Sequence, residues 1–503
     1  MADIGSNSAR LLVVRPTQLG HLDVLADARV ALRLVRDLDP AGRLSRGAVQ
    51  RTVQTLQAFT TIARRHGARS VRVVATSAVR DAANRDNVVA EVQRRAGVEL
   101  TVLSGEEEAR LALVGAVSAL PVENGAVVDL GGGSMELAAF TRRRFRVGVT
   151  LPLGALRLGD LFLGHDPPRA EEVAALREHV RAALAAVDVT DVTAAESLVG
   201  TGGTIRALAK AARGRSAVAV NRLHGYELRR RDVEALVDRL VRLPTARRNT
   251  VPGISSTRAE SVLGGALVID VLMELSGAQS ILVSGYGVRQ GVVLDHLDLA
   301  GLRPRQVRDA SVSAVLERLR GDTPGSLRRR AVLNGLAAHL APRLDAALLE
   351  NTAHAARLVD AGAHLDHYGR WSETANLVTT ADLDGFTHAA LASIAAVLLC
   401  AGEAAVPAAL RRESRVARAD LQRAGVLLAL ADDVDRRLPP GRAGTVVGLK
   451  DGRIDITGMP SMLLPFALAD RCRTVLHRDV RQLGDGSRPR SRGRPPEVAV
   501  EFK

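Results

Sequence analysis

Apolar positions follow two different patterns along the chain. Up to about residue 300, short apolar runs alternate with glycine-rich turns, as at the β-branched run Val71 to Ala75. Residues 45–67 place apolar side chains three or four positions apart, which predicts a helix with Ser45 as its N-cap and Gly67 at its end. Beyond about Leu302, alanine, leucine and arginine dominate. The pattern predicts an α/β part followed by an all-α part.

The stretch Ala126 to Leu137 stands at the centre of the α/β part. An apolar run ends in Asp129, a glycine turn follows, and apolar residues resume after Glu136, which predicts a β-hairpin. Glycines leave backbone amides open to a polyanion, and carboxylates beside the turn suit a divalent cation. A glycine turn without a ligand is the alternative interpretation. The candidate phosphate-binding residues of this turn are Gly131, Gly132, Gly133 and Ser134.

The same order of residue types recurs at the start of the chain. Asp3, an apolar residue, Gly5 and three polar residues precede the apolar run Leu11 to Val14. Two copies predict two related half-domains that face each other, with Asp3, Asp129 and Glu136 positioning a metal ion. The three polar residues of the first copy are Ser6, Asn7 and Ser8.

A third glycine turn follows a short apolar run and precedes the helical stretch Ile205 to Ala212. Its residues Gly202, Gly203 and Thr204 suit a phosphate or nucleotide contact, because amides at a helix N-terminus attract anions.

Ser104 and Glu107 stand three residues apart before an apolar run, which predicts a capping box at a helix start. Glu107 then bonds backbone amides and Glu106 complements the helix dipole. Glu108 is left without a structural role. Arg80 follows a predicted strand, and the residues alone favour a solvated helix position for it.

The net charge of +14 lies almost wholly on arginine, since lysine occurs only at positions 210, 450 and 503. A basic surface attracts polyanions, although arginine content also follows genomic composition. Nucleic acid is a weak interpretation, because one Trp, three Tyr and seven Phe give few platforms for base stacking. Cys400 and Cys472 suggest neither a disulfide framework nor a zinc site, so a reducing cytoplasm is expected. Neither a membrane span nor a signal peptide is predicted.

Seven motifs occur in order over the first ~300 residues, which is far more specific than any single glycine turn. They are DIGSNSARLL, ATSAVRDAANRDN, SGEEEAR, VDLGGGSMEL, LPLGALRL, GTGGTIRALA and SGYGVRQGVVLD. In this order they resemble the exopolyphosphatase and guanosine pentaphosphate phosphohydrolase family, within the actin, sugar-kinase and chaperone-ATPase superfamily.

The resemblance implies two ribonuclease-H-like α/β halves, residues 1–118 and 119–300, flanking a cleft. It makes Glu108, which stands immediately before Ala-Arg, the expected general base, and it makes Arg80 a contact for the phosphate chain. It further implies a cytoplasmic enzyme, commonly a homodimer, that hydrolyses inorganic polyphosphate with Mg²⁺ or another divalent cation such as Mn²⁺. The alternatives are a guanosine pentaphosphate 5′-phosphohydrolase and a non-enzymatic sensor of polyphosphate or alarmone; a kinase of the superfamily is less favoured.

Residues 301–435 resemble the HD-like helical domain of longer family members. The histidine of the His-Asp pair is replaced by Val359, and Asp360 alone cannot hold a hydrolytic metal centre. This domain is therefore expected to be non-catalytic, with surface or packing histidines at positions 354, 364 and 367. The domain is expected to extend a basic track for long chains.

Residues 436–503 predict a small α/β segment. Alternation over 442–456 around Lys450-Asp-Gly452 indicates a β-hairpin, and residues 459–476 look helical. Residues 484–496 predict a mobile basic loop before a last strand at 497–502. At the other end, Met1 stands so close to the first glycine turn that the first strand is expected to be short or the natural start to lie upstream.

Overall fold

The computed structural model describes residues 1–187, 197–214, 218–319, 323–340, 344–437, 446–450, 453–457, 464–477 and 479–482. The chain divides into two compact units. The α/β unit comprises Met1–Ser216 and Leu223–Arg308, and the helical unit comprises Ala217–Arg222 and Asp309–Lys503. Nothing in the sequence pattern indicated that the short segment 217–222 belongs with the helical unit. No helix among the described residues is long and apolar enough to cross a membrane.

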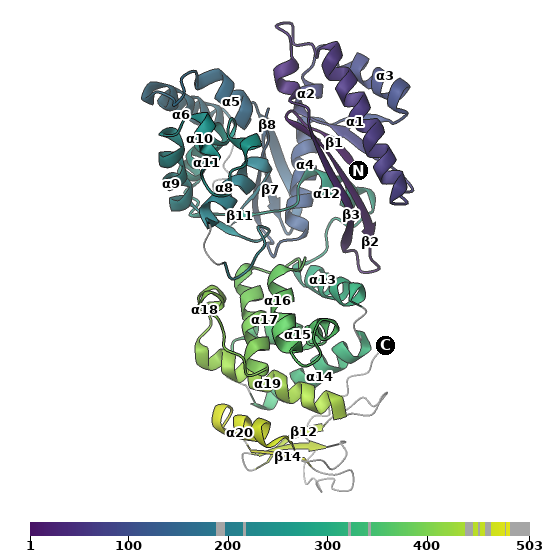
Figure 1. Ribbon diagram of the computed structural model, residues 1–503, viewed down its shortest axis with the longest axis vertical. Coiled ribbons are helices and arrows are strands. Elements are labelled where there is room, and N and C mark those ends of the chain that lie inside the picture. The colour runs from purple at the N-terminus through teal and green to yellow at the C-terminus, as the bar shows by residue number, and fades with distance from the viewer. Residues whose placement is uncertain are drawn as a thin grey trace. The chain divides into compact units, whose positions relative to one another are not determined.

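The first half of the α/β unit is a sheet of order β3-β2-β1-β4-β5, on which helices α1 and α3 pack (Figure 1). Ser45 accepts the amide of Ala48 at 3.1 Å, which confirms the predicted N-cap of α1. Phe59 of α1 lies in the core with the strands. The elements are β1 Ala2–Ile4, β2 Ser8–Pro16, β3 Leu22–Ala31, η1 Leu34–Asp37, α1 Arg46–Arg65, β4 Val73–Ala75, α2 Ser77–Arg80, α3 Arg85–Ala96 and β5 Leu100–Val102.

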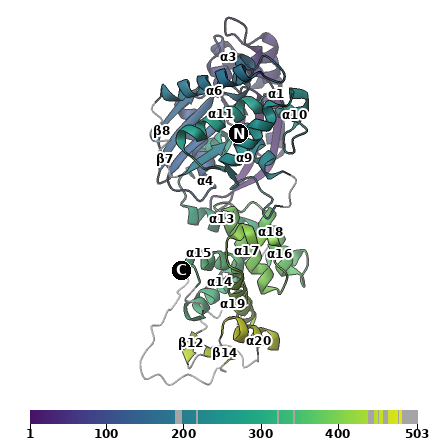
Figure 2. The ribbon, with the colours of Figure 1, turned by 90° about the vertical axis from the view of Figure 1, so that its left-hand side faces the viewer.

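The second half is a sheet of order β10-β11-β9-β6-β7-β8. Helices α6 and α11 pack together in its main core (Figure 2). Its first elements are β6 Gly125–Leu130, β7 Met135–Thr141, β8 Arg144–Leu151, α5 Ala155–Phe162, α6 Ala170–Ala185, β9 Leu198–Thr201 and α8 Gly203–Arg213. The remainder are β10 Glu227–Arg229, α9 Arg230–Val241, α10 Thr245–Arg248, η2 Ser256–Arg258, α11 Val262–Ser276, β11 Ser280–Val283 and α12 Val288–His296. Mixed α/β structure with two sheets was predicted.

Helix α4, Gly105–Ser118, lies between the two sheets. Leu113 packs with residues of the second sheet, whereas Leu111 packs with strand β4 of the first sheet and with α12. The contact with α12 is backbone to backbone, because an added Cβ at Gly291 would lie 1.9 Å from the carbonyl oxygen of Leu111. A residue at the start of α4 is therefore fixed relative to both halves.

Residues 142–146 contain four arginines, a pattern that favours a solvated hairpin tip, but the Arg143 side chain is held by backbone carbonyls. Its Nη1 donates to the carbonyls of Leu120 and Val122, both at 2.8 Å. Its Nη2 donates to Val117 at 2.7 Å and to Ser118 at 3.0 Å. Burial lowers the pKa of Arg143 to about 10. The side chain satisfies carbonyls at the C-terminal end of α4, which a helix cannot satisfy by itself.

The helical unit has one aliphatic core formed by its helices, as the composition predicts. The boundary between the two units lies within the first helix, α13 Pro304–Arg318. The helices that follow are α14 Thr323–Leu340, α15 Ala346–Leu358, η3 Ala361–His364, α16 Arg370–Thr380, α17 His388–Ala401, α18 Ala408–Ser414 and α19 Arg418–Arg437. A small sheet and a helix follow, with β12 Val446–Lys450, β13 Arg453–Thr457, α20 Phe466–Val475 and β14 Asp479–Gln482.

Strands β12 and β13 pair antiparallel with Lys450 opposite Arg453, which confirms the predicted hairpin strands. Within the stretch 459–476, which was predicted to be helical, helix α20 spans Phe466–Val475. The turn residues 451–452, the basic loop at 484–496 and the strand at 497–502 lie outside the described residues.

Candidate active site

The central hairpin is formed by β6 and β7, which pair antiparallel with Asp129 opposite Glu136. The Gly132 carbonyl accepts two amide hydrogen bonds, at 3.0 and 3.1 Å, from the first turn of α5. An added Cβ at Gly154, just before α5, would lie 2.2 Å from the carbonyl carbon of Gly133. The predicted hairpin is confirmed, and its glycine tip packs directly against the backbone at Gly154.

The turn between β1 and β2 meets this hairpin tip. The hydroxyls of Ser6 and Ser77 share a hydrogen bond of 2.7 Å. An added Cβ at Gly133 would lie 2.7 Å from the Ser6 Oγ and 2.8 Å from the Ser77 Oγ, and one at Gly132 would lie 3.2 Å from the Cβ of Asn7. The two glycine turns therefore face each other, as their repeated pattern predicts.

The third glycine turn closes on the central hairpin. Gly202 has a φ of +95°, and an added Cβ there would lie 2.8 Å from the Asp129 Oδ1. Gly203 begins α8 beside it. The Thr204 side chain is buried and packs against Gly265 of α11, so it does not line the site. A phosphate contact through the backbone amide of Thr204 stays a prediction.

A cavity between the two halves brings most of the predicted residues together. Arg80 and Thr204 are the two predicted residues that do not line it. The predicted residues that line it are Asp3, Ser6, Asn7, Ser8, Glu108, Asp129, Gly131, Gly132, Gly133, Ser134, Glu136, Gly202 and Gly203.

Glu108 reaches the cavity from the first turn of α4, and its side chain is bound to Arg80. The Arg80 Nη1 donates to the Glu108 Oε2 at 2.6 Å. Burial raises the pKa of Glu108 to about 7, although the Arg80 guanidinium acts in the opposite direction. Neighbouring Glu107 forms the predicted capping box with Ser104. The structure confirms Glu107 as a capping residue, whereas the side chain of Glu108 lines the cavity.

Four arginines of the cavity wall were not predicted as site residues. Burial and the charge of Arg10 lower the pKa of Arg206 to about 9, and burial lowers that of Arg258 to about 10. Arg10 and Arg289 come from β2 and α12. Arg10, Arg206 and Arg289 lie within the quoted motifs and Arg258 lies outside them. Only their convergence on one cavity distinguishes the four from the other arginines. Cations that repel one another in a partly desolvated wall favour an anionic ligand.

The three carboxylates expected to position a metal all line the cavity; Glu136 is buried, and Asp3 and Asp129 are partly buried. Burial raises the pKa of Asp3 to about 6. Burial also raises the pKa of Asp129, and it raises that of Glu136 well above its ordinary value, with the negative charge of Glu108 acting in the same direction. A cation among these groups would offset their mutual repulsion.

The arrangement fits a hydrated cation better than a fully protein-ligated one. Asp3 Oδ1 is buried without a hydrogen-bond partner among the described residues. No group of three or more His, Cys, Asp or Glu side chains in the described part of the chain is placed to ligate one metal directly. Mg²⁺ commonly keeps several waters and takes one or two carboxylates plus substrate phosphates. The donor set present here suits that mode of binding.

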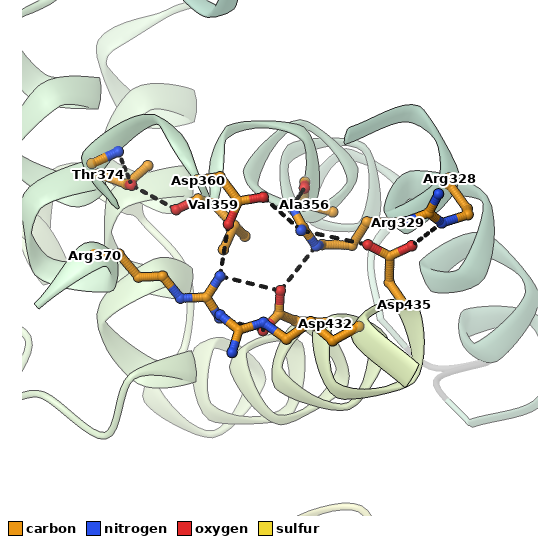
Figure 3. A network of polar contacts seen from close by, with 11 residues as sticks. Arg328, Arg329, Ala356, Val359, Asp360, Arg370, Thr374, Asp432 and Asp435 are labelled. Atoms are coloured by element: carbon orange, nitrogen blue, oxygen red, sulfur yellow. Dashed lines mark hydrogen bonds and ion pairs between the residues drawn. The ribbon is translucent and has the colours of Figure 1, made fainter. Parts of the chain in front are cut away.

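The helical unit neutralises Asp360 with arginines (Figure 3). Arg329 Nη2 lies 2.7 Å from one oxygen of Asp360, and Arg370 Nη1 lies 2.7 Å from the other. Both arginines also pair with Asp432 of α19. Val359 contributes only its carbonyl, which accepts a hydrogen bond from the Thr374 hydroxyl at 3.0 Å. Guanidinium groups, rather than histidines, surround this carboxylate.

The histidines of this unit behave as expected from the sequence. His354 is buried and packs edge-on against Phe386, with ring centroids 4.9 Å apart. His364 and His367 are exposed.

Comparisons with known proteins cover the α/β unit. The family model described as "Ppx/GppA phosphatase family" matches residues 12–300. Exopolyphosphatase 1 of Mycobacterium tuberculosis is 32% identical over 300 residues, which cover 59% of this chain and 87% of that protein. Exopolyphosphatase 2 of the same organism is 32% identical over 308 residues, 58% of this chain and 96% of that protein.

Solved structures give the same picture. The crystal structure of the Aquifex aeolicus member of the Ppx/GppA family has a TM-score of 0.53 and 28% identity, covering 59% of this chain and 96% of that chain. An exopolyphosphatase from Cytophaga hutchinsonii has a TM-score of 0.54 and 25% identity, covering 59% of this chain and 96% of that chain. These relatives match the α/β unit over almost their whole length.

Proposed function

Because the chain belongs to the Ppx/GppA phosphatase family, we propose that it is an exopolyphosphatase, which removes the terminal phosphate from inorganic polyphosphate. The observation that carries this proposal is the meeting of Glu108, three glycine turns and four arginines in one cavity. A base beside phosphate-binding turns suits phosphoanhydride hydrolysis, and a basic wall suits a substrate that stays anionic along its length. The named relatives are consistent with this substrate.

In the proposed reaction, a water oxygen bonds to the terminal phosphorus while the bridging P–O bond to the rest of the chain breaks. Glu108 accepts one proton of that water and later returns it to solvent, so the products are orthophosphate and a chain one phosphate shorter. Backbone amides of the glycine turns, with Ser6, Asn7 and Ser134, donate hydrogen bonds to the terminal phosphoryl oxygens. No covalent intermediate is needed.

A divalent cation, Mg²⁺ or Mn²⁺, would offset phosphate charge in this cavity. Asp3, Asp129 and Glu136 are the residues that would hold it, mainly through water. Arg206 and Arg289 then contact phosphates beyond the terminal one, where they also hold the chain against diffusion between successive cleavages.

The helical unit is proposed to be a degenerate HD-like domain without chemistry of its own, because arginines stand around Asp360 where a metal would need further ligands. The ribonuclease-H-like kinship of the two halves, a cytoplasmic location and a homodimer are further proposals that rest on the family.

Phosphate release by the purified chain with Mg²⁺ tests the proposed function. Long polyphosphate and guanosine pentaphosphate are compared side by side at equal concentrations of terminal phosphate. We expect faster release from polyphosphate, with the chain shortened from its end rather than cut internally on a gel. Faster release from guanosine pentaphosphate would assign the alternative 5′-phosphohydrolase function. Binding of either compound without release would leave a sensor and overturn the enzymatic proposal.

A further inference from the structure

Arg80 and Glu108 form a close, partly buried ion pair beside the cavity. Their side chains are only 16% and 8% exposed, and the Nη1 to Oε2 distance is 2.6 Å. The same Nη1 donates to the carbonyl of Leu103 at 3.2 Å. Arg80 is therefore occupied in the free protein, although the family resemblance makes it a contact for phosphate.

The position of the pair allows both roles. Arg80 ends α2, three residues after Ser77, whose hydroxyl lies against the central glycine turn. Glu108 itself lines the cavity. A phosphoryl group seated on the glycine turn would share the cavity with Glu108, to which the Arg80 guanidinium is bonded.

The two roles compete chemically. A carboxylate bonded to a guanidinium is stabilised in its charged form, so it holds a transferred proton less well. A terminal phosphoryl group presents several anionic oxygens in a geometry that a guanidinium binds well. An arriving phosphate therefore competes with Glu108 for the same cation.

We propose that Arg80 exchanges partners: Glu108 holds it in the free protein, and the terminal phosphoryl group takes it when substrate binds, which frees Glu108 to accept the proton of the attacking water. This proposal rests on the proposed function and adds a positioning residue to it. The base is masked until a phosphate is in place, so the exchange couples substrate binding to base activation.

Carboxylates near Glu108 also favour its protonated form. In addition to burial, Asp129 and Asp3 raise the pKa of Glu108, and the charge of Glu108 in turn raises that of Glu136. When Arg80 moves to the phosphate, Glu108 loses the guanidinium whose hydrogen bond and charge lower its pKa. Proton acceptance by Glu108 is then favoured.

A double-mutant cycle in binding tests the exchange without any turnover. The probe is imidodiphosphate, whose bridging nitrogen resists hydrolysis, titrated calorimetrically at a fixed Mg²⁺ concentration into wild type, Glu108→Gln, Arg80→Met and the double variant. Exchange predicts that Glu108→Gln tightens binding, because the competing partner is gone. It also predicts that most of this gain disappears in the Arg80→Met background. The expected difference between the two backgrounds is about tenfold.

Glu107→Gln is the matched control, since it removes the same charge from the same helical turn without touching Arg80. Its effect should be small and equal in both backgrounds. Arg80→Lys keeps the cation and should recover part of the coupling, and it replaces Arg80→Met if a melting curve shows that the latter is unfolded.

Effects of Glu108→Gln that agree within about twofold in the two backgrounds would overturn the exchange, because Arg80 would then keep its partner in the complex. Absence of any imidodiphosphate binding would overturn it as well. The proposed function is tested separately. If the binding data show the coupling but the wild-type protein releases no phosphate from polyphosphate, the exchange stands and the enzymatic proposal is overturned. If the protein hydrolyses polyphosphate but the effects of the two substitutions on binding are additive, the enzymatic proposal stands and the exchange is overturned.

Discussion

Glu107 and Glu108 are neighbours in the first turn of α4, but only Glu107 is bound to the helix itself. The Glu107 Oε2 accepts the amide of Ser104 at 2.9 Å, and the Ser104 hydroxyl accepts the amide of Glu107 at 3.2 Å. Glu108 turns toward the cavity and Arg80. Two adjacent, chemically identical side chains therefore have different partners.

Replacing Glu108 by Gln should lower the rate of phosphate release by about 10²–10⁴-fold, because it removes the proton acceptor without changing side-chain size. Glu107→Gln should instead cost about 1 kcal/mol of stability, typical of a lost cap, and leave the rate nearly unchanged. Phosphate-release assays and thermal melts on both variants provide the measurement. Wild-type turnover by Glu108→Gln would reassign this residue to a structural role.

Hydrolysis should decline as the pH falls through about 7. The base must be deprotonated to act, and burial raises the pKa of Glu108 to about 7 in the free protein. Below that pH the protonated, inactive form predominates, whereas above it the rate levels off. A pH profile of kcat/KM reports the free enzyme and so measures this limb. A profile that stays flat down to pH 5 would contradict the assignment.

Asp129→Ala should raise the Mg²⁺ concentration needed for half-maximal activity and lower turnover as well, since this carboxylate is assigned to the cation. Titration of activity with metal decides the matter. Asp238→Ala, an exposed aspartate on α9, is the control and should reproduce the wild-type curve. An unchanged curve for Asp129→Ala would mean that Asp3 and Glu136 suffice.

The features that could be predicted from the sequence are those fixed by local backbone chemistry. Asp129 opposite Glu136 around a glycine turn follows from residue order within one hairpin, and the capping box at Ser104 follows from two residues three positions apart. The second glycine turn could be placed opposite the first because the pattern repeats.

The features that were missed depend on contacts between distant segments. Arg206 of α8 and Arg258 of η2 reach the same cavity from elements far apart in the sequence, and no local pattern separates them from the many solvated arginines of this chain. Thr204 belongs to a motif that suits phosphate, yet the packing of α11 turns it into the core. Tertiary packing, rather than local sequence, decides the direction of each of these side chains.

The contacts of Arg143 could likewise not be predicted from local sequence, and they lead to a further prediction. Arg143→Ala should lower the free energy of unfolding by about 2–3 kcal/mol, because it leaves the carbonyls of Leu120 and Val122, just beyond α4, without their donor. Arg144→Ala, one residue further on and exposed, should change it by less than about 0.5 kcal/mol. Chemical denaturation of the two variants gives the comparison. Equal effects would mean that water replaces the lost donor at these carbonyls.

The last prediction concerns the helical unit and follows from the pairing of Asp360 with two arginines. Arg329 and Arg370 are only 4% and 6% exposed, so removing the carboxylate leaves buried positive charge without its full complement. Breaking a buried pair costs about 3–5 kcal/mol, and the lower end is expected because both arginines keep Asp432.

Asp360→Ala should therefore lower the melting temperature of the helical unit while phosphate release, measured below that transition, stays at the wild-type rate. Asp366→Ala, which changes an exposed aspartate, should affect neither quantity. Elemental analysis should find the same metal content in the wild type and in Asp360→Ala, since the guanidinium groups already supply the positive charge beside this carboxylate. A loss of hydrolysis in a folded Asp360→Ala protein, or a metal lost with this side chain, would show that the helical unit takes part in the chemistry and would overturn its assignment as non-catalytic.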